Sequence, residues 1–348
     1  MRKILYLLLA LCSAAGAEVP LEKMIGQMIA VGFDGSSSSH EWIKLIKKQI
    51  RNGEVGAVVM YAKNIVDPRQ LQQLAASMHT QGSPLPIWVM VDQEGGKIER
   101  LPASKGFAGF PSAAKVARGS VANAFGVYRN MACELRGYAI NFNLAPVVDL
   151  DVNNSVISSQ SRAFSKKPEA VAKYADAFIR AHNSCGVLTA LKHFPGYGST
   201  VNDTHFESAD TTALYDKQEM EPYRLLLNRA HAVMVSHMVD RNVDDLPASL
   251  SKKQIDLLRT IGFGGVVMTD DLQMAAIASN FDLNETVIRA INAGNDMLLF
   301  SNMLASDREI PYKVRRIILE AVKNKEISAD RIKASYGRIA ALKRKRLG

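Results

Sequence analysis

The sequence predicts an α/β protein, a single (β/α)8 barrel with additional C-terminal helices. Short apolar runs rich in β-branched residues recur along the 348 residues and alternate with amphipathic stretches of helical length. This alternation is typical of parallel strands joined by helices. Several runs end in an ionisable residue, as barrel strands do where they deliver side chains to the C-terminal face. No Pro-, Ser- or Gly-rich linker interrupts the chain, so we expect one domain over residues 18–348.

Eight apolar runs are candidate strands, because each is short and apolar on both faces, as a strand covered by helices must be. In chain order they span residues 28–33, 56–61, 87–91, 141–148, 186–191, 232–235, 265–269 and 296–300. The clearest helical stretches between them span residues 41–51, 68–79, 168–184, 252–261 and 284–293. The stretch 311–346 follows the last strand, so we expect its helices to pack outside the barrel.

The first 17 residues are typical of a secretory signal peptide. Arg2 and Lys3 form a basic start, residues 4–11 an apolar core, and residues 15–17 a small-residue cleavage site. The core is shorter than the ~20 residues that span a bilayer, and no later stretch is long and apolar enough to do so. We therefore expect an exported protein, periplasmic or secreted, that acts as a monomer without a membrane span.

The chain is basic, with a formal net charge of +9, and residues 343–346 concentrate positive charge near the C-terminus. We expect a solvated basic tail there. Anionic envelope polymers are the alternative partner of this tail. Nucleic acid is not an expected partner, because it lies inside the cytoplasm and the protein is expected outside it.

Two cysteines follow the leader, Cys133 and Cys185. Export permits a disulfide between them. Their apolar, helix-like surroundings nevertheless favour two buried free thiols. The sequence has no Cys-x-x-Cys pair, so it gives no support for structural zinc.

The segment after the fifth apolar run carries the strongest functional signal. It reads Lys192-His193-Phe194-Pro195-Gly196-Tyr197-Gly198-Ser199-Thr200 and is followed by Asp203-Thr204-His205. An aspartate two residues from a histidine can hold one ring nitrogen, and a histidine so oriented gives and takes a proton near neutral pH. Gly196 and Gly198 would let the loop flex, so that this pair swings in when substrate binds.

Four separate runs end in ionisable residues, which are Asp92, Lys192 with His193, His237 and Asp270. Because parallel strands of a barrel all end on the same face, we expect these side chains to converge on one site. Asp271 follows Asp270 directly. Adjacent strand residues point to opposite faces, so only one of these two aspartates is expected to face the barrel mouth.

A carboxylate nucleophile with a proton donor across a cleft is the arrangement of retaining glycosidases. Asp270 can supply the nucleophile, and His205, tuned by Asp203, can supply the proton. His237 fits either a sugar contact or a buried structural histidine. The other charged groups can make strong hydrogen bonds to sugar hydroxyls. They are Asp92, Arg100, Arg162, Lys192 and His193.

On these residues the chain resembles the family 3 glycoside hydrolases that act as β-N-acetylglucosaminidases, in the single-barrel branch that trims peptidoglycan fragments. The resemblance runs from about Lys23 to about Leu299. It is carried by residues 91–96 with Arg100, 144–149, Arg162, 192–196 with 203–205, His237 and 269–274. The chain departs from the family pattern at Tyr197, where histidine is usual, at Ala163, where serine is preferred, and in carrying a leader.

The resemblance implies a role for each matched residue. Asp270 is the nucleophile, and His205 is the acid/base with Asp203 as its partner. The N-acetylglucosamine ring is held by Asp92, Arg100, Arg162, Lys192 and His193, with His237 also binding substrate. The implied reaction removes a terminal non-reducing β-N-acetylglucosamine from fragments of the GlcNAc-anhydroMurNAc type. It retains the anomeric configuration, passes through a glycosyl-Asp270 intermediate, and needs no metal or organic cofactor.

Other functions stay open on the sequence alone. Within the family, a β-glucosidase or an N-acetylglucosamine phosphorylase is possible. A metal-dependent barrel hydrolase could use His193, His205, Asp203 and Asp270, although residues 31–34 lack the His-x-His of many such barrels. A glycan-binding protein on an inactive scaffold is disfavoured, because the Asp203–His205 pair and Asp270 are intact.

Overall fold

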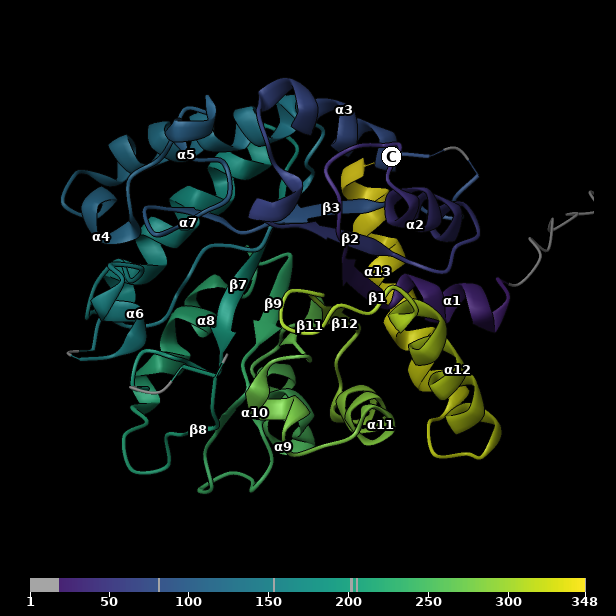
Figure 1. Cartoon of the computed structure of the whole chain (residues 1–348). Coiled ribbons are helices and arrows are strands. Elements are labelled where there is room, and N and C mark those ends of the chain that lie inside the picture. The colour runs from purple at the N-terminus through teal and green to yellow at the C-terminus, as the bar shows by residue number, and fades with distance from the viewer. Residues whose placement is uncertain (1–18, 81, 153, 201–202, 205, 348) are drawn as a thin grey trace, which may run out of the picture.

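The computed structural model describes residues 19–80, 82–152, 154–200, 203–204 and 206–347 (Figure 1). Its centre is a closed barrel of parallel strands. Their order around the barrel is β1 (Ile29–Gly32), β12 (Met297–Phe300), β11 (Val266–Asp271), β9 (Ala232–Val235), β7 (Leu188–Phe194), β6 (Phe142–Asn143), β3 (Trp88–Val91) and β2 (Ala57–Met60). Each candidate strand of the sequence corresponds to one of these eight, so the predicted fold class is confirmed.

The barrel strands are buried on both faces, which explains why they read as continuous apolar runs rather than alternating ones. β6 is shorter than the predicted run 141–148. Pro146 has no amide hydrogen to donate to a ladder, so regular pairing stops before it and resumes at a single bridge between Val147 and Lys192.

Helices surround the barrel, as Figure 1 shows, and their ends follow from the sequence. Asp67, Ser251 and Asp282 each accept a hydrogen bond from a backbone amide three residues later, which fixes the starts of the helices that begin at residues 68, 252 and 283. The longer outer helices are α2 (Glu41–Arg51), α3 (Pro68–Met78), α5 (Val121–Gly137), α7 (Pro168–Ser184), α9 (Lys252–Thr260) and α11 (Leu283–Ala293). None of the helices in the described part of the chain is both long and apolar enough to cross a membrane.

The C-terminal helices α12 (Ile310–Lys323) and α13 (Ala329–Leu347) pack against α1 (Leu21–Gln27), near β1 (Figure 1). Lys343 of α13 is fully buried. Its Nζ donates to Gln27 Oε1 (2.8 Å) and to the Gly56 carbonyl (2.7 Å), just before β1 and β2 begin. The expectation of a solvated tail is therefore wrong for this residue, whose pKa burial lowers to about 7. Its ammonium also lies over the Trp88 ring.

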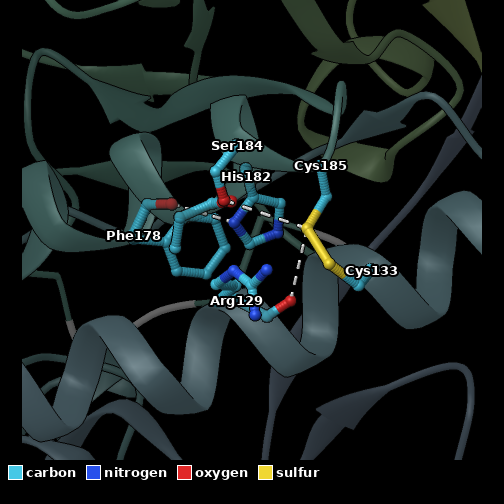
Figure 2. Close-up of a disulfide and its surroundings, with 7 residues drawn as sticks. Arg129, Cys133, Phe178, His182, Ser184 and Cys185 are labelled. Carbon is cyan, nitrogen blue, oxygen red and sulfur yellow. Dashed lines mark hydrogen bonds between the residues drawn. A yellow bond between two sulfur atoms is a disulfide. The ribbon is translucent and has the colours of Figure 1, made fainter.

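A disulfide joins Cys133 of α5 to Cys185, the residue after α7 (Figure 2). The prediction of two buried free thiols is wrong, because Cys133 is exposed and Cys185 is partly exposed. Neighbouring outer helices of a barrel run parallel, so their C-terminal ends meet on one side, and the two Cα atoms are 5.2 Å apart. Beside the bridge, the ring of His182 stacks on Phe178 (Figure 2).

Candidate active site

A cavity of about 400 Å³ opens where the barrel strands end. Its lining includes most of the predicted site residues, which are Asp92, Arg100, Arg162, Lys192, His193, Asp203 and Asp270. They come from segments up to 178 positions apart in the sequence, from Asp92 to Asp270, and the barrel brings them together. His205 lies outside the described residues, and His237 lies behind the cavity wall rather than on it.

Lys192 forms the charged centre of the cavity floor. Its Nζ lies 2.9 Å from Asp92 Oδ1 and 2.7 Å from Glu94 Oε1, and its side chain is only 3% exposed. Asp92 Oδ2 also lies 3.5 Å from Arg100 Nη2. Burial opposes the charge on Asp92, but Lys192 and Arg100 outweigh it and hold its pKa below the usual value. Asp92 and Lys192 are therefore both charged at neutral pH.

Glu94 and Arg162 form a bidentate ion pair beside Lys192. Arg162 donates from Nε to Oε2 and from Nη2 to Oε1 of Glu94, both at 2.8 Å. Burial alone would raise the pKa of Glu94. The charges of Arg162 and Lys192 outweigh that effect and hold the pKa well below its usual range. Glu94 lies within the segment 91–96 that carries the family resemblance, but the sequence alone did not indicate its role. Its position two residues beyond Asp92, after the same strand, was the available signal.

His193 is held by Asp149, a second carboxylate that received no role from the sequence. The His193 Nδ1–H donates to Asp149 Oδ2 (2.7 Å), and the His193 amide donates to Oδ1 (3.0 Å). The other ring nitrogen, Nε2, then accepts from Arg162 Nη2 at 3.4 Å. This arrangement holds the ring between Asp149 on one side and Arg162 on the other.

Asp270 and Asp271 are both among the residues that line the cavity, but the Asp271 carboxylate accepts hydrogen bonds from the Gln273 amide and from the Ser301 amide and hydroxyl. The pairing of β11 with β12 shifts register between Met268 and Asp271, which breaks the regular alternation of side chains. The Asp271 amide donates to Asp270 Oδ1 at 2.8 Å. Burial raises the pKa of Asp271 to about 6, against hydrogen bonds from Ser301 that favour its ionised form.

His237 is almost fully buried and supports Asp271 from behind. Its Nε2 donates to the Asp271 carbonyl at 2.9 Å, and its Nδ1 accepts from the Ser249 hydroxyl at 2.7 Å. His237 thus contacts the backbone next to Asp270, and its predicted contact with the sugar stays a prediction. His237 follows the end of β9 by two residues, close to the predicted strand end.

The loop after β7 is packed rather than loose. Residues 194–200 are buried, and Glu219 accepts hydrogen bonds from the Gly198 amide (2.7 Å) and the Ser199 hydroxyl. A side chain on Gly196 would collide with Glu219, and one on Gly198 with the Leu150 backbone. These glycines therefore allow close packing, which differs from the predicted role in flexing. Burial raises the pKa of Glu219 to about 7.

Tyr197 ties this loop to the segment that carries Asp203. Its hydroxyl accepts from the Thr204 amide (2.9 Å) and donates to the Thr204 hydroxyl oxygen (3.2 Å). Its own amide donates to Asp149 Oδ1 at 2.9 Å. Burial raises the pKa of Tyr197 to about 12, so the phenol stays protonated as a donor. Asp149 thus supports both His193 and the start of the loop.

Within the described residues, no group of three or more His, Cys, Asp or Glu side chains is arranged to hold a metal ion. The charged groups of the floor are instead paired with one another, two carboxylates with Lys192 and Arg162. A ligand with many hydroxyls can insert into such a floor, because each carboxylate can still accept and each cation can still donate further hydrogen bonds.

Residues 20–342 match the family described as the N-terminal domain of glycosyl hydrolase family 3. The chain is 32% identical over 267 residues to a β-hexosaminidase of Nitrosomonas eutropha, covering 73% of this chain and 76% of that protein. It is 36% identical over 275 residues to the β-hexosaminidase LpqI of Mycobacterium tuberculosis, covering 75% of this chain and 69% of that protein.

Solved structures of the same family share the fold. A family 3 β-N-acetylglucosaminidase from Paenibacillus sp. str. FPU-7 matches 94% of this chain with a TM-score of 0.85 and 31% identity, and the match spans 63% of that chain. A family 3 glycosyl hydrolase from Mycobacterium smegmatis matches 94% of this chain and 98% of its own, with a TM-score of 0.82 and 30% identity. The chain therefore belongs to glycoside hydrolase family 3, and it is a glycoside hydrolase of the β-hexosaminidase type.

Proposed function

We propose that the protein is a retaining exo-β-N-acetylglucosaminidase that removes terminal non-reducing β-N-acetylglucosamine from peptidoglycan-derived fragments of the GlcNAc-anhydroMurNAc type. One observation carries the proposal. Asp270 and Asp203 line the same cavity, over a floor of paired charges suited to a sugar ring. Relatives and solved neighbours named as β-hexosaminidases and β-N-acetylglucosaminidases support it.

In this proposal the terminal sugar binds on the cavity floor. Asp92 and Glu94 accept hydrogen bonds from its hydroxyls, while Lys192, Arg100 and Arg162 donate to them. Because these charges are already paired and buried, they need little reorganisation when the sugar arrives. His193, held by Asp149, completes the floor.

The reaction then proceeds in two steps. The Asp270 carboxylate attacks the anomeric carbon as the bond to the leaving oxygen breaks, and His205, oriented by Asp203, gives that oxygen a proton. In the second step His205 takes a proton from water, which attacks the anomeric carbon and displaces Asp270. Two inversions give net retention. The Asp271 amide bound to Asp270 Oδ1 orients the nucleophile.

We also propose that the enzyme is exported and meets its substrate in the periplasm or outside the cell. The leader-like residues 1–17, which lie outside the described residues, motivate this. The Cys133–Cys185 disulfide supports it, because such bonds persist in oxidising compartments. We further propose that the enzyme acts as a monomer.

The proposal is tested by comparing an aryl β-N-acetylglucosaminide with the matching aryl β-glucoside, with the Asp270→Asn variant as control. We expect the wild type to hydrolyse the N-acetylglucosaminide and the Asp270→Asn variant to lose this activity. Preference for the glucoside would overturn the assignment of N-acetylglucosamine. Product analysis in phosphate buffer identifies a phosphorylase, because such an enzyme would release N-acetylglucosamine 1-phosphate in place of the free sugar.

A further inference from the structure

Three large apolar side chains are exposed at the mouth of the active-site cavity. Phe206 is 77% exposed, Leu304 is 53% exposed and Met303 is 47% exposed, and all three line the cavity. Other exposed large apolar side chains in the described chain, such as Leu257 and Tyr312, are not part of this lining. Scattered exposed apolar residues are ordinary, whereas a group at one cavity mouth marks a binding surface.

The mouth contrasts with the floor in chemistry. Lys192, Asp92 and Glu94 make the floor charged and nearly buried, while the mouth offers apolar area to whatever extends out of the cavity. A terminal sugar bound through its hydroxyls satisfies the floor. The mouth suits a group that presents carbon-bound hydrogens, such as the face of a second pyranose ring.

The position of Phe206 relative to Asp203 identifies which part of the substrate it can reach. The Phe206 amide donates to the Asp203 carbonyl at 3.0 Å, so both residues belong to one turn. Asp203 is the proposed partner of the proton donor, and a proton donor must lie beside the glycosidic oxygen. The group on the far side of that oxygen is the aglycone. In the proposed mechanism Phe206 therefore lies close to the glycosidic oxygen, from which the aglycone extends.

Met303 and Leu304 are presented by an anchored loop after β12. The Asn302 amide donates to Gln273 Oε1 (2.7 Å), and the Asn302 side chain donates to the Gly32 carbonyl (2.9 Å). The Met303 amide donates to the Ser301 hydroxyl oxygen at 3.1 Å. These contacts hold the backbone in place, so little conformational entropy is lost when a ligand covers the two side chains.

We propose that Phe206, Met303 and Leu304 form an aglycone subsite that binds the second sugar ring of the substrate through its apolar face. The inference rests on the proposed function and adds the residues that select the aglycone. The enzyme then distinguishes disaccharide-like substrates from glycosides with a small aglycone at the mouth of the cavity. Recognition of the terminal sugar stays with the charged floor.

The test measures kcat/KM for two substrates, the β-1,4-linked disaccharide of N-acetylglucosamine and methyl β-N-acetylglucosaminide. GlcNAc-anhydroMurNAc is a third arm, which shows whether the subsite also serves a muramic-type ring. Phe206→Ala is expected to lower the ratio of disaccharide to methyl glycoside about tenfold, since a stacked ring and its buried area contribute about that much. A double Met303→Ala, Leu304→Ala variant is expected to lower the same ratio by a smaller factor.

Matched controls separate recognition from folding. Phe206→Tyr keeps the ring and is expected to keep the ratio. Leu257→Ala removes an equally apolar exposed side chain on the outer helix α9 and is expected to leave both substrates unchanged. If Phe206→Ala left the ratio of the two kcat/KM values unchanged, whether or not both values fell, the assignment of the subsite would be wrong. Failure of the wild type on every N-acetylglucosaminide, by contrast, would overturn the proposed function itself.

Discussion

Tyr197 and Ala163 are the two residues at which the active-site segments depart from the family pattern, and they share one small apolar cluster with Val147 and Ile157. A phenol ring and a methyl group suit that cluster. Because both side chains pack in this cluster, a change at one position alters the surroundings of the other. The Tyr197 hydroxyl reaches beyond the cluster to Thr204.

This coupling predicts a double-mutant result. Tyr197→His alone is expected to destabilise the protein, because it leaves an imidazole among apolar groups and loses the Thr204 contacts. Ala163→Ser alone buries an unpaired hydroxyl. The double variant is expected to be more stable than the sum of the two changes by about 1 kcal/mol. Urea unfolding of the four proteins measures this, and strict additivity would show that the positions are independent.

The acid/base assignment predicts a dependence on the leaving group. His205→Ala is expected to lower kcat/KM about 100-fold or more for poor leaving groups, which need a proton, and far less for activated aryl glycosides. Asp203→Ala is expected to give a milder form of the same pattern. A series of aryl glycosides with leaving groups of different pKa measures it. Equal losses across the series would refute the role of His205.

The placement of site residues was predictable from the sequence where a motif put a charge at a strand end. Asp92, Lys192 and Asp270 are of this kind, and all three line the cavity. Glu219 was not predictable, because its partners Gly198 and Ser199 are about 20 residues away and no local pattern marks it. Its part in the loop emerges only when η3 (Lys217–Met220) folds under the segment after β7.

At the scale of elements, the loop after β7 has its own internal support. Asp149 accepts from the Tyr197 amide at one end, Glu219 accepts from the Gly198 amide, and Tyr197 bonds to Thr204 at the far end. The segment that carries Asp203 is therefore linked to the barrel at several points. The two carboxylates that make these links, Asp149 and Glu219, are buried, and neither lines the cavity.

Glu219 predicts a pH-dependent stability. Its folded pKa of about 7 is above its ordinary value of 4.5, so the folded state holds the proton more tightly between these values. Its contribution to stability is thus greatest at acid pH and declines as pH rises through 7. Relative to Glu219→Gln, the wild type is expected to lose about 2–3 kcal/mol of unfolding free energy between pH 5 and pH 8.

Thermal or urea unfolding at several pH values measures this difference. Glu221→Gln is the matched control, because Glu221 is exposed and lies two residues away on α8 (Glu221–Leu226). A constant gap between wild type and Glu219→Gln across this pH range would show that Glu219 keeps an ordinary pKa in the folded protein.

The bounds of the elements were predictable where one pattern dominated. The helices 41–51 and 168–184 agree with the sequence prediction to the residue, because strong periodicity and clear ends coincide. β6 ends at Asn143, short of its predicted run, because Pro146 interrupts the ladder and pairing resumes only at the bridge between Val147 and Lys192. The register shift in β11 was also hidden, since no residue type at 268–271 requires it.

At the scale of the whole molecule, the barrel closes through pairing of β1 with both β2 and β12, which are far apart in sequence. Alternation of strands and helices was enough to predict this closure. The same topology explains the disulfide, since α5 and α7 lie side by side (Figure 1) and their C-terminal ends meet at Cys133 and Cys185. The local sequence around each cysteine could not show that these two helix ends are close in space.

The disulfide closes a loop with a sequence separation of 52 residues. In the chain-entropy model, a bridge of that span stabilises a protein by about 4 kcal/mol at most. The Cys133→Ser, Cys185→Ser variant is therefore expected to unfold at a lower temperature while keeping wild-type kcat/KM, because the bridge is remote from the cavity lining. An unchanged melting temperature under oxidising conditions would show that the bridge adds no stability.

The most direct test of the central claim is to trap the glycosyl-enzyme. A fluorinated N-acetylglucosaminyl donor, whose covalent intermediate turns over slowly, is incubated with the mature protein, and the modified peptide is located by mass spectrometry. We predict one added sugar per protein on Asp270, which Asp270→Asn does not acquire. Label on a different residue, or hydrolysis of the donor with no covalent adduct at any time, would contradict the mechanism.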